Sequence, residues 1–150
     1  MSLLKDRIGA DLVLSMKSGD RPRLGTLRLI LSAVQSEEIS RRGSARSAEL
    51  SDTDLITVLK REVKKRRDSV ALYRSNGRED LASQEESEIA CIRAYLPDEV
   101  SREAIEEIAK RLATPGMEFG TLMRAVIEAT GGAADGALVA EVVKRVLLNR

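Results

Sequence analysis

Few side chains in this sequence could carry covalent or metal chemistry. The chain of 150 residues contains no histidine, which removes the usual general base at neutral pH and the commonest metal ligand. Its one cysteine, Cys91, lies between two apolar residues, a setting typical of a core position rather than of a nucleophile. We therefore expect no metal site, no cofactor and no internal disulfide bond.

Two further motifs are weak candidates for a catalytic site. Glu85, Glu86 and Glu88 gather acids in one segment, but no second cluster is predicted to converge on them, so salt bridging and solubility explain them better. The segment GGAADGAL, residues 131–138, lacks the Lys and Ser or Thr that follow the glycines of a phosphate-binding loop. It is better explained as a turn with a helix cap, and its members are Gly131, Gly132, Asp135 and Gly136. No catalytic residue is predicted, and the sequence leaves open whether the chain is an enzyme.

Basic side chains are the remaining functional candidates. Lys and Arg (25) nearly balance Asp and Glu (24) over the whole chain, but residues 51–78 hold eight bases and four acids, whereas residues 79–107 hold two bases and ten acids. A local basic surface could contact phosphates without reading base sequence. Aromatic residues for base stacking make up only 2 % of the chain, and a run of charge on a helix is often merely solvated. The candidates for nucleic-acid contact are Lys60, Arg61, Lys64, Lys65 and Arg67.

Hydrophobic spacing predicts helices along nearly the whole chain, and the alternation typical of strands is absent. Asp20, Ser51 and Ser101 are predicted to cap helices, and residues 40–50, rich in Ser, Arg and Gly, are predicted to form a loop. Pro97 disfavours continuation of the helix before it. We expect an all-α fold with an N-terminal lobe of about four helices, residues 1–96, and a small C-terminal lobe of three helices, residues 97–150.

One charged residue falls on the apolar side of its predicted helix. Arg66 lies between Val63 and Val70, where an unpaired charge would be costly. Glu85 lies in the apolar stripe of the next helix, and residues 75–77 form a predicted tight turn between the two helices. We predict a shielded ion pair between Arg66 and Glu85, or Glu88 one turn away, that fixes the register of this helical hairpin.

Three segments in order along the chain resemble the GatB/YqeY family. They are TLRLILSA at 26–33, LSDTDLITVLKREVKKRRDSVALYRSNGREDLASQEESEIACIRAYLP at 50–97, and GGAADGALVAEVVKRVL at 131–147. The resemblance covers essentially the whole chain. It indicates a stand-alone YqeY-like protein, similar to the C-terminal tail of the B subunit of the tRNA-dependent amidotransferase.

The resemblance implies an all-helical fold with a larger N-terminal lobe and a three-helix tail. It also implies partnership with tRNA, or with tRNA-aminoacylation or amidotransferase proteins, and a family-level label of carbon–nitrogen ligase activity with glutamine as amido-N-donor. The domains that catalyse that reaction in the large enzyme have no counterpart in this chain, so binding without catalysis is expected. The alternatives are a component of a tRNA-dependent amidotransferase, and a protein–protein adaptor in which the acidic fourth helix meets a basic partner without RNA.

No apolar run reaches the roughly 18 residues that a membrane span needs. We expect a cytoplasmic protein that binds neither membranes nor DNA.

Overall fold

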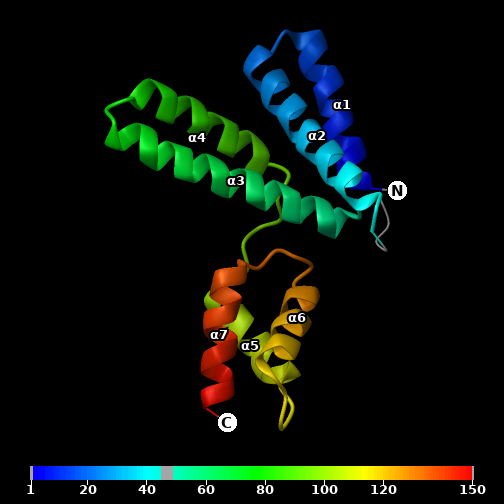
Figure 1. Cartoon of the computed structure of the whole chain (residues 1–150), viewed down its shortest axis with the longest axis vertical. Coiled ribbons are helices and arrows are strands. Elements are labelled where there is room, and N and C mark those ends of the chain that lie inside the picture. The colour runs from blue at the N-terminus through cyan, green and yellow to red at the C-terminus, as the bar shows by residue number, and fades with distance from the viewer. Residues whose placement is uncertain (1, 45–48, 150) are drawn as a thin grey trace. The chain divides into compact units, whose positions relative to one another are not determined.

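The computed structural model describes residues 2–44 and 49–149, and its regular elements over those ranges are all helices (Figure 1). The all-α prediction is confirmed. The chain divides into two compact units, Met1–Leu96 and Pro97–Arg150, each with its own hydrophobic core. The helices are α1 Leu3–Ser18, α2 Arg21–Arg41, α3 Asp52–Ser75, α4 Glu79–Arg93, α5 Arg102–Leu112, α6 Phe119–Ala129 and α7 Gly136–Leu148.

Local side-chain chemistry sets the helix boundaries. Asp20 caps α2 by accepting from the Arg23 backbone N–H, and Ser51 forms a reciprocal capping box with Asp54 at the start of α3. Ser101 caps α5 by accepting from the Ala104 backbone N–H, without a reciprocal bond. These caps agree with the sequence predictions. The predicted loop at 40–50 begins slightly later, because α2 continues to Arg41, and its residues 45–48 lie outside the described ranges.

The first unit consists of two antiparallel helix pairs, α1 with α2 and α3 with α4 (Figure 1). Its core is apolar and draws on all four helices. None of the described helices combines the length with the apolar composition that a bilayer crossing requires. The largest fully buried side chains of this core are Ile8, Leu27, Ile30, Leu50, Leu55, Leu59 and Ile92.

A polar cluster fastens the end of α4 to the first helix pair. The buried Tyr95 hydroxyl donates to Asp11 of α1 at 2.5 Å and accepts from Arg23 of α2 at 3.5 Å. The Arg7 guanidinium lies 4.9 Å from the centroid of the Tyr95 ring and donates to the Ala94 carbonyl. Burial, and then the hydrogen bond to Asp11, raise the pKa of Tyr95, so the phenol stays neutral and keeps donating.

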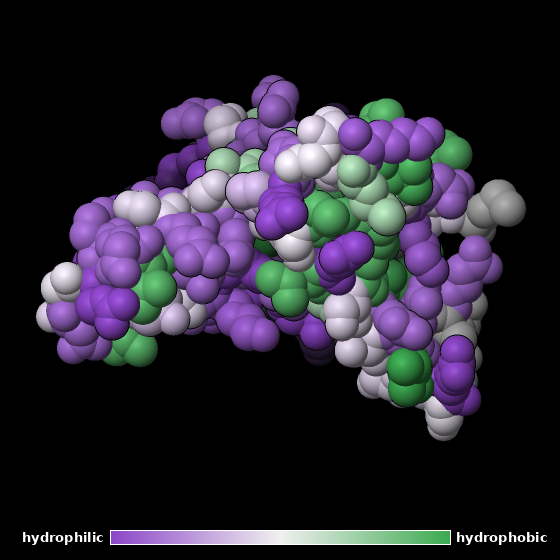
Figure 2. All heavy atoms as spheres, turned by 90° about the horizontal axis from the view of Figure 1, so that it is seen from above, coloured by the Kyte–Doolittle hydropathy of each residue, from purple (hydrophilic) through white to green (hydrophobic). Residues whose placement is uncertain are grey.

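The face of the molecule seen in Figure 2 is mostly hydrophilic. Its largest hydrophobic group lies near the middle, and smaller hydrophobic groups lie toward the edges. Among the described residues, α1 exposes more large hydrophobic side chains than any other helix, and these are Leu3, Val13, Leu14 and Met16.

The second unit is a bundle of α5, α6 and α7. Ile105 of α5, Leu122 and Val126 of α6, and Val139 and Val143 of α7 are all fully buried at its centre. Each of the three helices therefore contributes one apolar stripe to a shared core. The opposite faces of the helices are left for solvent or for a partner.

Candidate functional site

The basic run predicted as a nucleic-acid surface lies on α3. Apolar residues of α3, among them Leu59 and Val63, are buried against the rest of the first unit, which turns the bases outward. Lys64, Lys65 and Arg67 are exposed, Arg61 keeps 61 % of its side chain exposed, and Lys60 is half-buried.

These bases do not gather in one patch. Arg61 and Lys65 line a groove between α3 and α2, and the Arg61 guanidinium lies 3.4 Å from the Glu37 carboxylate across it. Arg67 instead lines a groove between α3 and α4 with Glu86 and Arg93. The positive charge is thus divided between two sides of the helix and is offset by acids on both.

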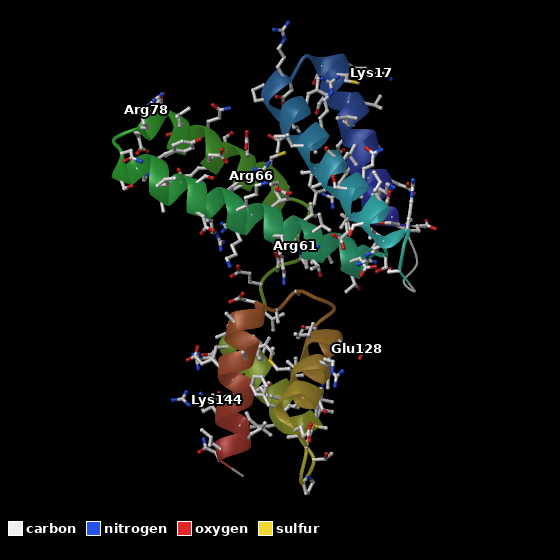
Figure 3. All side chains as sticks on the ribbon, in the orientation of Figure 1. Lys17, Arg61, Arg66, Arg78, Glu128 and Lys144 are labelled. Atoms are coloured by element: carbon white, nitrogen blue, oxygen red, sulfur yellow. The ribbon has the colours of Figure 1, made fainter. Side chains whose placement is uncertain are left out.

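Arg66 is the buried member of the run. Its Nη1 donates to Glu62 at 2.7 Å and its Nε donates to Glu88 of α4 at 3.0 Å, while only 9 % of the side chain is exposed. In Figure 3 Arg66 lies between α3 and α4, whereas Arg61 lies on the other side of α3. Burial alone would lower the pKa of Arg66, but the two carboxylates outweigh it and raise that pKa.

The prediction that Glu85 is the first partner of Arg66 is corrected. Arg66 instead bonds Glu88, the predicted alternative. The reason is that α3 ends at Ser75 and α4 begins at Glu79, so the turn is centred on Gly77, one to two residues later than the predicted pairing requires. Arg66 and Glu88 are equally far in sequence from that centre. Glu85 lies beside the pair, and its pKa is raised by burial and then by the negative charge of Glu88.

The C-terminal glycine motif forms a turn between α6 and α7. Gly131 and Gly132 have φ of 59° and 82°, in the left-handed region that favours glycine. The Asp135 carboxylate caps α7 by accepting from the Leu138 backbone N–H at 3.4 Å, and Gly136 is the first residue of that helix. Backbone geometry and capping thus account for these four residues.

The remaining chemical candidates have no reactive setting. Cys91 is half-buried, and burial raises the pKa of its thiol, which disfavours the nucleophilic thiolate. Within residues 2–44 and 49–149, no three acids or cysteines come together as a metal site would require.

A groove that the sequence analysis missed runs along α5 and α7 in the second unit. It encloses about 600 Å³, and its floor is largely apolar. Val142 and Val146 of α7 form the floor, and Ala113 and Pro115 continue it beyond the end of α5. One feature of the sequence could have indicated this groove. Charged residues recur every four positions along α5 and form one rim, and they are Arg102, Glu106 and Lys110.

The two helices of this groove run in the same direction. Arg102, at the start of α5, donates to Glu141, in the middle of α7, at 2.5 Å. At the other end, Thr114 and Pro115 line the groove together with Asn149. Lys110 pairs with Glu106 on α5 at 3.2 Å, whereas Arg145 of α7 forms no ion pair with the described residues. The rim therefore has an excess of positive charge at its C-terminal end.

Comparison with known proteins identifies the class of this helical chain. YqeY-like proteins match it over residues 5–147, so the chain belongs to the YqeY-like protein family. This agrees with the resemblance seen in the sequence.

Curated relatives match with moderate identity. An uncharacterized protein of Schizosaccharomyces pombe is 36 % identical over 87 residues, which are 58 % of this chain and 67 % of that protein. Altered inheritance of mitochondria protein 41, mitochondrial, of Pyrenophora tritici-repentis is 26 % identical over 151 residues, 94 % of this chain and 79 % of that protein. The protein of the same name from Vanderwaltozyma polyspora is 33 % identical over 86 residues, 57 % of this chain and 44 % of that protein. The match therefore spans less than half of the V. polyspora protein.

Two functional predictions are corrected by these relatives. The predicted tRNA-binding or amidotransferase role is contradicted, because the named relatives are called after altered inheritance of mitochondria, and nothing in those names refers to tRNA or amide transfer. The expected cytoplasmic location is contradicted as well, because the same names place those proteins in mitochondria.

Proposed function

We propose that this protein is a docking module that holds one helix of a protein partner in the groove between α5 and α7. The observation that carries the proposal is the shape of that groove: an apolar floor of Val142, Val146, Ala113 and Pro115 between two charged rims. Grooves of this kind accept amphipathic helices, whose apolar face covers the floor while their polar face remains in water.

The fold of the second unit supports the proposal. Three helices share one core, and a fourth helix laid along α5 and α7 would extend it in the manner of a four-helix bundle. The floor residue Val146 is half-buried in the free chain, so a partner would complete its burial. Burial of apolar surface is the main source of affinity in such contacts.

Site-specific photocrosslinking tests this function. The full chain carries benzoylphenylalanine in place of Val146, in the groove, and in a matched variant in place of Ile127, which is also half-buried against the same core but lies on α6 outside the groove. A nuclease-treated mitochondrial extract is the first source of partners, because the named relatives are mitochondrial proteins.

We expect crosslinks from position 146 to one recurring protein segment that becomes helical when its synthetic peptide binds the chain. Position 127 should not capture that segment. Equal capture from both positions, or a captured peptide that stays unstructured when bound, would contradict the docking function.

A further inference from the structure

We infer that the helix held between α5 and α7 lies antiparallel to both of them and carries acidic residues in its own first turn. This inference rests on the proposed docking function and names the chemistry and direction of its partner. It follows from the direction of the two groove helices and from the distribution of charge along the rims.

The two helices that form the groove, α5 and α7, run in the same direction. Arg102 at the start of α5 meets Glu141 in the middle of α7, and Thr114 and Asn149, just beyond the C-terminal ends of the two helices, line the groove together. Both helices therefore end at the same end of the groove, where their carbonyl groups present two partial negative charges. The N-terminus of an incoming helix has the opposite partial charge. An antiparallel orientation places it at that end.

Basic side chains lie at the end of the groove where α5 and α7 terminate. Lys110 and Arg145 stand in the last turns of α5 and α7, one on each rim. Arg145 forms no ion pair with the described residues, and Lys110 shares only the partly exposed Glu106. Acidic residues in the first turn of the incoming helix would meet these bases, and they are also the residues that favour a helix N-terminus.

At the opposite end of the groove, the charges of the described residues that meet there are already paired. Arg102 and Glu141 already neutralise each other there across the two helices. The side-chain charge along the groove is thus positive at one end and balanced at the other. The groove extends along α5, a helix of 11 residues or about 16 Å, so the bound segment needs about three turns. Its apolar residues should recur at three- and four-residue spacing to cover Val146, Ala113 and Pro115.

The test uses two designed peptides of about 14 residues, enough for the three turns and caps of the groove. Both have the same composition and the same leucine stripe. One has glutamates in its first turn and lysines in its last, and the other has these charges exchanged. Each carries a nitroxide label at its N-terminus and is titrated into the isotope-labelled full chain.

We expect the acid-first peptide to bind about tenfold more tightly than the exchanged peptide, the ratio that two or three surface charge contacts can produce. Its label should broaden the amide signals near Thr114 and Asn149, and not those near Arg102. The double variant Lys110→Gln with Arg145→Gln should bring the two affinities within about twofold of each other. The matched variant Lys144→Gln removes an exposed base of α7 that does not line the groove (Figure 3), and it should keep the tenfold preference.

The outcomes separate this inference from the function on which it rests. Two peptides that bind in the groove with equal affinity, or a label that broadens the signals near Arg102, would overturn the predicted direction and leave docking intact. Signal changes outside α5 and α7 for both peptides would overturn the docking function itself. Loss of the preference in Lys144→Gln would show that general positive charge, and not the rim of the groove, selects the peptide.

Discussion

Arg66 carries a full positive charge at a position where only 9 % of its side chain reaches solvent. The two glutamates that flank it, Glu62 and Glu88, are themselves 18 % exposed. Ion pairs of this kind contribute little net stability compared with apolar packing, but removal of one partner leaves an uncompensated charge. The charges of Arg66, Glu62 and Glu88 therefore depend on one another, and a change at any of the three affects the other two.

Replacement of Arg66 by Met should lower the free energy of unfolding by about 2–4 kcal/mol, because Glu62 and Glu88 then face each other without a counter-charge. Urea denaturation followed by circular dichroism measures this change. Adding Glu62→Gln and Glu88→Gln should recover part of the loss. The matched variant Arg67→Met, at an exposed position one residue away, should stay within about 0.5 kcal/mol of the unaltered chain.

Asp54 makes the free energy of unfolding depend on pH in the acid range. The hydrogen bond from Arg41 at 2.9 Å, followed by the contacts with Ser51, lowers the pKa of Asp54 from 3.8 to about 2. A carboxylate whose pKa is lowered by folding stabilises the folded state above its unfolded pKa and loses this effect as pH falls through its folded pKa.

Asp54→Asn should therefore cost about 1 kcal/mol at pH 7, because the amide lacks the negative charge that pairs with Arg41. The difference between variant and unaltered chain should shrink as pH falls from 3.8 toward 2. Denaturation curves over this range measure it, and the change in slope between these two pH values is the quantity compared. A constant difference down to pH 2 would contradict the assigned pKa.

At the scale of helices, local signals decided what the sequence could predict. The caps at Asp20, Ser51 and Ser101 depend on a few consecutive residues, so their side-chain types were sufficient. The register of α3 against α4 depends on which residue centres the turn, and the choice between Glu85 and Glu88 changed with it. The position of the turn centre comes from the left-handed backbone of Gly77, which the sequence alone did not reveal.

The candidate groove could not be predicted from the sequence, for a different reason. Its rims come from α5 and α7, which are separated by α6, and their parallel direction follows only from the packed bundle. Apolar stripes indicate which side of each helix faces the core, but they say nothing about the α5 series of Arg102, Glu106 and Lys110. The basic run of α3 was found correctly on a solvent face, but the way it divides between two grooves depends on α2 and α4.

Two glycines in different backbone settings should respond in opposite directions to the same change. Gly77→Ala places a side chain at φ 72° in the α3–α4 turn and should destabilise the chain by about 1 kcal/mol. Gly9→Ala adds a methyl group inside α1, with nothing within 4 Å of it, and should stabilise the chain by about 0.5–1 kcal/mol. Thermal unfolding of both variants measures the effects. A change of the same sign in both would contradict the assigned turn.

On the scale of the whole molecule, the chain consists of two helical units with separate cores, joined at residues 97–101, which have no regular structure. The face seen in Figure 2 is mostly hydrophilic, and the groove of the first unit between α2 and α3 is lined by paired charges, Arg61 with Glu37 and Arg66 with Glu62. The second unit has a largely apolar groove, and Arg145 on its rim forms no ion pair with the described residues. This difference is why we place partner binding in the second unit.

A map of backbone amide shifts tests that placement most directly. The isotope-labelled full chain is titrated with the acid-first peptide, and the shifted residues are located in the structure. The account predicts shifts concentrated in α5 and α7 beside Val142, Val146 and Lys110, with the first unit unchanged. Shifts concentrated on the α3 bases or on the outer face of α1, with α5 and α7 unaffected, would contradict it.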